Sequence, residues 1–228
     1  GNNFSQANAG FIPVSEADAQ FVDFDEDNDL DVCIMGYNAS GQATFTMYRN
    51  DNGLFTTVDI GIAGLAEGSM DWKDFNLDGL VDCAVMGLNE ANVPVTAVFA
   101  NQGGNFTIQS IDLEGLPGLY QGDIIWQDPT NGSYDLVIGG IDILGDAQIH
   151  YYQNLGSLFR HINWLDAVPM EDPVFAPNNI TTPNFYEYLV MGRTAQGDQR
   201  INGFVFDDPT HALPGLTNGD LQWTDYDL

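Results

Sequence analysis

The chain has 228 residues, with 33 acidic residues against five Lys and Arg, which gives a formal net charge of −28. Such a charge repels phosphate backbones, so nucleic acid is excluded as an expected partner. No apolar run approaches the roughly 18 residues that a membrane-spanning helix needs, so no membrane insertion is expected either.

A short signature recurs four times along the chain: an acidic residue, three mostly apolar residues, and then Met-Gly or Gly-Gly. Its acidic residues stand at intervals of 51, 53 and 52 residues and are Asp31, Asp82, Asp135 and Glu187. A second pattern, Gly-Leu-x-x-Gly-x-x-x-Trp, ends at Trp72, Trp126 and Trp223. Two independent patterns with a similar spacing indicate internal repeats.

Followed along the chain, each repeat has the composition of short strands joined by turns. In the second repeat, apolar and β-branched runs at residues 81–86, 93–100 and 106–113 alternate with Gly, Asn and Asp. No segment shows a sustained apolar period of 3.6 residues, so no helix is expected. Three or four strands in each repeat of about 50 residues predict an all-β fold built of β-propeller blades. A parallel β-helix, whose coils usually repeat faster, is the rival fold.

We interpret residues 1–228 as a single array of propeller repeats. Counted from one Asp-rich loop to the next, the units are residues 23–73, 74–127, 128–177 and 178–224. Residues 1–22 form a partial unit and residues 225–228 begin a further one. Since these overhangs do not complete one another, we expect a segment of a larger, seven-bladed propeller, with further blades or neighbouring subunits covering its ends. A closed four-bladed ring with an extra hairpin is the alternative.

Two Asp-rich loops, residues 23–31 and 74–82, carry oxygen-bearing side chains at positions 1, 3, 5 and 9. In the first loop these are Asp23, Asp25, Asp27 and Asp31, with Asp29 at position 7; in the second they are Asp74, Asn76, Asp78 and Asp82, with Leu80 at position 7. Ca²⁺ prefers six to eight oxygen ligands. The alternating side chains and the position-7 carbonyl supply such ligands, and position 6 is Asn28 or Gly79, residue types that tolerate a left-handed backbone.

These loops differ from an EF-hand, which closes with a Glu at position 12, because position 12 here is Ile34 or Val85 within an apolar run. The third loop is one residue shorter and lacks the middle acid, and its candidate ligands are Asp128, Thr130, Asn131 and Asp135. The fourth loop, residues 176–187, has lost the pattern. We therefore expect about two Ca²⁺ ions per chain.

At these loops the sequence resembles the FG-GAP/VCBS repeat family, which includes the integrin α-subunit propeller. The family loop reads D-x-D-x-D-G-x-x-D before an apolar strand. The second loop departs from it at Asn76 and the first at Asn28. The resemblance covers the chain as four units, of which two have intact loops. It implies a secreted or cell-surface propeller, stabilised by Ca²⁺, that binds other proteins or glycans in adhesion or surface assembly.

No nucleophile, phosphate-binding or metalloprotease motif accompanies the three histidines, His150, His161 and His211. Each is expected to be an ordinary strand or turn residue. A non-catalytic extracellular module is therefore the favoured function. The alternative is a domain of a secreted polysaccharide-degrading lyase or hydrolase.

The remaining candidate sites are thiols and sequons. Cys33 and Cys83 occupy the same predicted strand of successive repeats, which favours two buried thiols over a disulfide between repeats. Five N-x-S/T sequons mark candidate glycosylation sites at Asn3, Asn38, Asn105, Asn131 and Asn179.

Overall fold

The computed structural model describes residues 9–109, 115–127, 133–156 and 159–162, and the backbone of the strands at residues 170–177, 187–194, 199–205 and 212–214. The described residues contain 16 strands in four antiparallel sheets and include no helix of the length and apolarity needed to cross a membrane. The expected all-β fold is confirmed.

Each sheet contains four strands that are consecutive in the chain and paired in order. Blade 1 consists of β1 (Ser15–Val22), β2 (Asp31–Tyr37), β3 (Ala43–Asp51) and β4 (Leu54–Val58). Blade 2 consists of β5 (Met70–Lys73), β6 (Asp82–Leu88), β7 (Pro94–Asn101) and β8 (Phe106–Gln109). Blade 3 consists of β9 (Tyr120–Gln127), β10 (Asp135–Ile141), β11 (Ala147–Asn154) and β12 (Phe159–Ile162). Blade 4 consists of β13 (Met170–Pro177), β14 (Glu187–Thr194), β15 (Gln199–Val205) and β16 (Ala212–Pro214).

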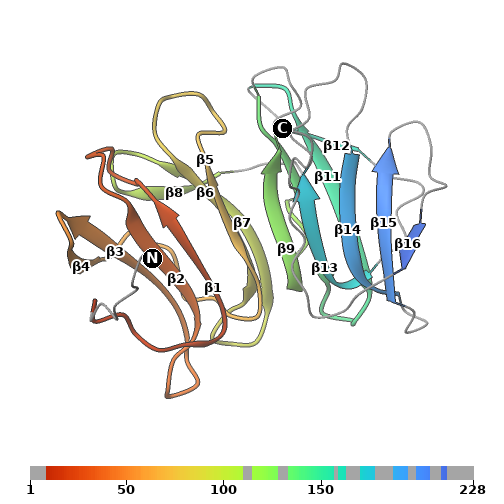
Figure 1. Ribbon diagram of the computed structural model, residues 1–228, viewed down its shortest axis with the longest axis horizontal. Coiled ribbons are helices and arrows are strands. Elements are labelled where there is room, and N and C mark those ends of the chain that lie inside the picture. The colour runs from red at the N-terminus through yellow and green to blue at the C-terminus, as the bar shows by residue number, and fades with distance from the viewer. Residues whose placement is uncertain are drawn as a thin grey trace, which may run out of the picture.

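The first strands of the four blades lie next to one another, as the innermost strands of a propeller do. β1 contacts β5, β5 contacts β9, and β9 contacts β13, and Figure 1 shows the blades following one another from β1 to β16. Side chains join these strands: the Met70 N–H donates to Asp18 Oδ2 at 3.0 Å, and the Ile124 N–H donates to Ser69 Oγ at 2.8 Å. The chain is therefore built of β-propeller blades, and antiparallel sheets rule out the parallel β-helix.

The blades begin one strand earlier than the units counted from the Asp-rich loops. Each loop joins the first strand of a blade to its second, so the unit at residues 23–73 contains β2, β3 and β4 of blade 1 together with β5 of blade 2. The partial unit at residues 1–22 thus contributes β1, the innermost strand of blade 1. Among the described strands, no contact of the extent that joins β1 to β5 links β13 back to β1.

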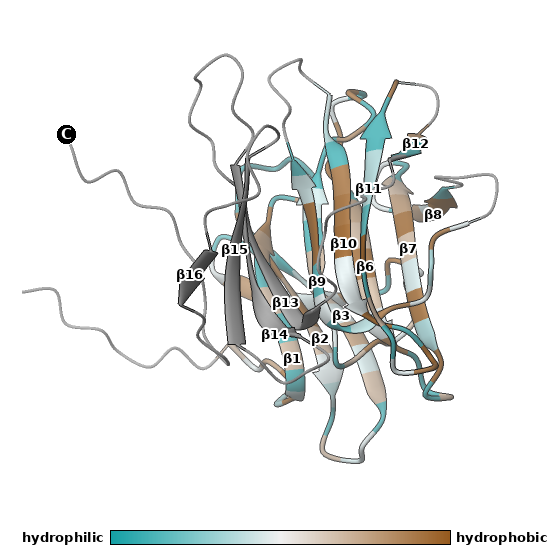
Figure 2. Ribbon diagram, turned by 90° about the vertical axis from the view of Figure 1, so that its right-hand side faces the viewer, coloured by the Kyte–Doolittle hydropathy of each residue, from teal (hydrophilic) through white to brown (hydrophobic). Residues whose placement is uncertain are grey.

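The core lies between neighbouring blades and is built from the second strands. Every residue of β6 is buried, and all but the last residue of β2 and β10 are buried. Cys33, Met35, Met70 and Val85 share one cluster between blades 1 and 2. Figure 2 shows hydrophobic residues along β7 and β10, within the stack of sheets. Cys33 and Cys83 are free, fully buried thiols, as expected.

The glycine of the repeated Met-Gly pair faces an irregular segment that precedes the first strand of its blade. Gly87 has φ 149°, and a Cβ there would lie 2.6 Å from the Ala66 carbonyl oxygen. Beside it, a Cβ on Gly68 would lie 2.0 Å from the Met86 carbonyl oxygen. Only glycine fits such a close approach of two backbones. The glycine of the repeated signature therefore marks a close approach between the second strand of a blade and the segment that leads into its first strand.

Backbone hydrogen bonds link these irregular points from blade to blade. Glu67 N–H donates to the Glu16 carbonyl at 3.0 Å, and Gln121 N–H donates to the Glu67 carbonyl at 2.7 Å. All three residues have left-handed backbones, with φ of 44°, 52° and 48° for Glu16, Glu67 and Gln121. A left-handed backbone is uncommon outside glycine and costs conformational energy. These two hydrogen bonds between blades therefore involve the residues whose backbone is in this unfavourable conformation.

Candidate functional site

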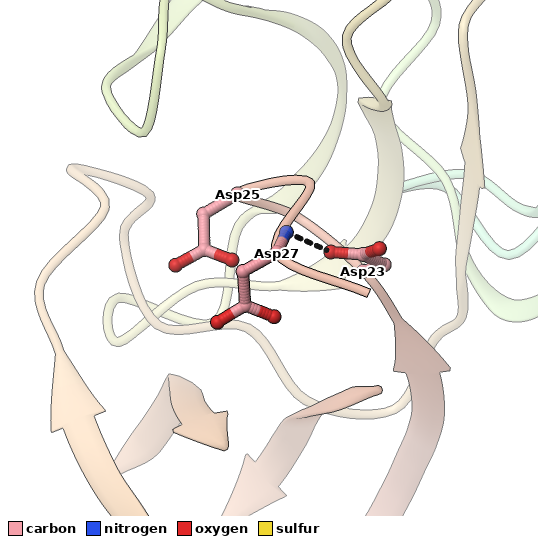
Figure 3. A group of neighbouring side chains, drawn as sticks. All are labelled: Asp23, Asp25 and Asp27. Carbon is pink, nitrogen blue, oxygen red and sulfur yellow. Dashed lines mark hydrogen bonds between the residues drawn. The ribbon is translucent and has the colours of Figure 1, made fainter. Parts of the chain in front are cut away.

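The first Asp-rich loop, residues 23–31, begins with a tight turn held by its own carboxylates. Asp23 accepts from the N–H groups of Asp27 and Asn28, both at 3.1 Å. Asn28 has φ 70°, the left-handed backbone that its position predicted. One carboxylate oxygen each from Asp23, Asp25 and Asp27 lies within 4.8 Å of the others (Figure 3). The turn therefore brings together three of the predicted ligands.

The second loop, residues 74–82, repeats this geometry, with the side-chain amide of Asn76 at its third position. Asp74 accepts from the N–H groups of Asp78 at 3.0 Å and Gly79 at 2.9 Å, and Asn76 Oδ1 also accepts from the Asp78 N–H at 2.9 Å. Gly79 has φ 93°, again as predicted. The loop at Leu80 is fixed by its N–H, which donates to Asp78 Oδ1 at 2.9 Å. The same local hydrogen bonds thus shape both loops.

The ninth residue of each loop, Asp31 or Asp82, is fully buried, and its carboxylate accepts hydrogen bonds from backbone N–H groups. Asp82 accepts from the N–H of Phe75 at 3.2 Å and from that of Asn101, on β7, at 2.9 Å. Asp31 makes the same pair of bonds to Phe24 and Asn50, at 3.0 and 2.8 Å. Burial raises the pKa of both carboxyls, to about 6 for Asp82. These acids fix the loop to the third strand of the blade, and a nearby cation would favour their charged form.

Asp135 is the corresponding residue of the third loop and is also fully buried. One of its oxygens accepts from the Asn154 N–H at 2.7 Å, and the other accepts from the Tyr151 hydroxyl. The other candidate ligands of this loop, Asp128, Thr130 and Asn131, lie outside the described residues, as does most of the fourth loop.

The first-loop residues fit a hard cation. Their donors are carboxylate oxygens, and burial, followed by the charge of Asp27, raises the pKa of Asp25. A bound cation would relieve this repulsion. Asp29 Oδ2 instead accepts from the Asn52 N–H in the β3–β4 turn at 2.8 Å, so this side chain ties two loops together. The carbonyls of Asp29 and Leu80 and the carboxylates of Asp31 and Asp82 remain predicted ligands.

Two of the five sequons lie in described hairpin turns. Asn105 is exposed between β7 and β8. Asn38, between β2 and β3, uses its side-chain oxygen to accept from the N–H groups of Ser40 and Gln42, at 2.9 and 3.1 Å. Asn3, Asn131 and Asn179 lie outside the described residues.

A cleft of about 610 Å³ opens beside the two Asp-rich loops, between β1 and β5. The Phe21 side chain in its wall is 71% exposed, and Leu30 and Leu77 are also exposed apolar residues. Lys73 Nζ lies 5.2 Å from the centroid of the Tyr134 ring. The polar residues of the lining are Gln20, Asp23, Asp71, Lys73 and Asp74. The cleft therefore combines exposed apolar surface with hydrogen-bonding groups.

Asp71 lies half-buried in the wall of this cleft. Its oxygens accept from the N–H groups of Trp72 at 2.9 Å and Trp126 at 2.6 Å, so it joins β5 to β9. Burial raises its pKa to about 6. The cleft could not be predicted from the sequence, because its lining residues come from three different blades. Phe21 stands 51 residues before Trp72, in the place that the repeated Trp takes in later repeats, and nothing in the sequence shows that its side chain is exposed.

No protein-family model matches the sequence, and a search of curated proteins found no match. Among solved structures, the chain is similar to a fungal lectin from Aleuria aurantia, a six-bladed β-propeller with a novel mode of fucose recognition. The superposition has a TM-score of 0.53 at 10% sequence identity and covers 93% of this chain and 71% of the lectin. This likeness supports the propeller fold.

Proposed function

We propose that the chain is a non-catalytic β-propeller module that binds neutral glycans in the cleft between blades 1 and 2. The observation that carries this proposal is the lining of the cleft, where the exposed ring of Phe21 lies near Gln20 and Lys73. Small-molecule sites are typically apolar concavities with a few polar groups, in the range of about 300–1,000 Å³. A sugar has the matching surfaces, a C–H face and a rim of hydroxyls.

Charge selects among glycans. Asp23, Asp71 and Asp74 outnumber Lys73 in the lining, and the whole chain is strongly acidic. Uronic acids and sulfated sugars would therefore be repelled, which favours neutral sugars. The fucose recognised by the Aleuria aurantia lectin is one neutral sugar handled on a propeller of this kind. At 10% identity, that likeness supports the class of ligand without assigning residues.

Ca²⁺ at the two Asp-rich loops is the second part of the proposal. The residues Asp23, Asp25 and Asp27, and Asp74, Asn76 and Asp78, would hold one ion each, with Asp31 and Asp82 behind them. Asp23 and Asp74 also border the cleft, so a bound ion would stiffen its rim and reduce its negative charge. The resemblance to FG-GAP/VCBS repeats supports this role and favours a secreted or cell-surface setting.

The alternative, a domain of a polysaccharide-degrading enzyme, needs a carboxyl group that is free to transfer protons. Asp71 has a suitably raised pKa, but both of its oxygens are bound to backbone N–H groups. Its contacts favour a structural role.

An array of neutral oligosaccharides, with uronic-acid oligosaccharides for comparison, tests the proposal. Hits are then titrated by calorimetry with Ca²⁺ present. Phe21→Ala should weaken binding by about tenfold or more, equivalent to about 1.4 kcal/mol. Leu144→Ala, which alters an exposed apolar residue of the β10–β11 turn, should leave binding unchanged. If no neutral saccharide binds, or if both variants bind equally well, the cleft is not a glycan site.

A further inference from the structure

Two of the chain's three histidines meet on the outer strands of blade 3, away from the cleft and the Asp-rich loops. His150 lies on β11 and His161 on β12, and His150 Nδ1 is 3.1 Å from His161 Nε2. His161 is exposed and His150 is half-buried. The two histidines are 11 positions apart in the sequence and meet only when the β11–β12 hairpin forms.

A chain of hydrogen bonds fixes which nitrogen of His150 carries the proton. Gln148 Nε2 donates to Asp142 Oδ2, so the amide oxygen of Gln148 faces His150 Nε2 at 2.8 Å. An amide oxygen only accepts, and His150 Nε2 is therefore the protonated nitrogen. The lone pair of His150 Nδ1 then points toward His161. A carboxylate or carbonyl on the far nitrogen is the arrangement that orients metal-binding histidines.

Tyr152 supports the pair from beneath. Its side chain is 2% exposed, and its ring stacks on His161 with centroids 4.8 Å apart and on His150 with centroids 6.3 Å apart. The ring of Tyr152 therefore holds the two imidazoles side by side.

We propose that His150 Nδ1 and His161 Nε2 together bind one transition-metal ion of the Cu²⁺ and Zn²⁺ class. Imidazole nitrogens bind such ions at about 2.0–2.1 Å, so two adjacent ligands lie roughly 3 Å apart, close to the observed 3.1 Å. Imidazole suits these metals, whereas Ca²⁺ prefers oxygen. His161 moves its proton from Nε2 to Nδ1 when the ion binds, and no net proton is released. Water fills the remaining positions on the open side.

Cu²⁺ titration with saturating Ca²⁺ present tests the proposal, since Ca²⁺ would compete for the oxygen-rich loops. Calorimetry should find one Cu²⁺ site of this kind per chain, and electron paramagnetic resonance should show coupling to two imidazole nitrogens. His150→Gln and His161→Gln should each weaken binding at least about tenfold. Gln148→Leu, which removes only the orienting contact, should weaken it by about tenfold.

His211→Gln is the matched control, because it removes the third histidine and should leave Cu²⁺ binding intact. Circular dichroism of each variant separates lost binding from lost folding. The proposal is overturned if the His150→Gln/His161→Gln double variant, still folded, keeps the same affinity and the same nitrogen coupling. An equal loss in His211→Gln would also overturn it. Neither result depends on whether the cleft binds glycans.

Discussion

Asn101, on the third strand of blade 2, donates its side-chain N–H to the carbonyl of Phe24 in the loop of blade 1, 77 residues earlier, at 2.9 Å. The next blade repeats the contact, since Asn154 donates to the carbonyl of Phe75 at 2.9 Å. The backbone N–H of each asparagine also donates to the anchoring acid of its own blade, Asp82 or Asp135. One residue thus joins a loop, a strand and the neighbouring blade.

Asn101→Ala should lower the free energy of unfolding by about 2–4 kcal/mol. It removes the bonds to Phe24 and Val81 and leaves the buried Phe24 carbonyl without this donor. Asn50→Ala is the matched control: Asn50 is the equivalent residue of blade 1, is less buried, and donates to Leu30 within its own blade. It should cost about 1 kcal/mol. Urea unfolding measures both, and equal losses would contradict the role between blades.

Gly87→Ala should destabilise the protein by more than about 2 kcal/mol, because the added Cβ meets the Ala66 carbonyl and the backbone φ is unfavourable for alanine. Gly53→Ala separates the two causes. Gly53 also has a positive φ, of 90°, but a Cβ there meets nothing within 4 Å. It should cost only about 1 kcal/mol. Thermal unfolding measures the loss of stability in each variant. A smaller loss for Gly87→Ala than for Gly53→Ala would contradict the close backbone approach at Gly87.

The raised pKa of Asp71 predicts a pH dependence of stability. Below pH 4 the carboxyl is protonated in both states. Between about pH 4 and pH 6 the folded protein binds more protons than the unfolded chain, so stability falls as the pH rises. The pKa difference of about two units corresponds to at most about 3 kcal/mol. In chelator, Asp71→Asn should reduce the slope of the stability profile between pH 4 and 6, and Asp82, whose pKa is also raised to about 6, should account for a remaining slope. An unchanged profile would show that Asp71 does not titrate in this range.

Removing Ca²⁺ should lower the melting temperature. Each site that binds only the folded chain adds about 2.7 kcal/mol at a hundredfold excess of ion over Kd. Asp78→Ala should remove one of two ions, as measured by elemental analysis after dialysis, and about half of the chelator effect. Glu90→Gln changes an exposed acid outside the loops and should remove neither. A melting curve indifferent to chelator would exclude calcium from both loops.

The strand content and the loops were readable from the sequence because their determinants are local. The apolar run at residues 81–86 predicted β6, and Gly79 marked the left-handed turn. The left-handed residues Glu16, Glu67 and Gln121 were not readable, since nothing in their side chains calls for that backbone. Phe21 and Tyr134 were not predicted to share a cleft because they stand more than 110 residues apart and are joined only by the stacking of blades.

The bonds made by Asn101 and Asn154 run in one direction along the chain. In each case the accepting carbonyl belongs to the earlier blade and the donating amide to the later one. During synthesis the receptor for each contact is therefore complete before its donor leaves the ribosome. Each new blade can dock on a finished neighbour as soon as its third strand emerges, which suits folding from the N-terminal side during translation.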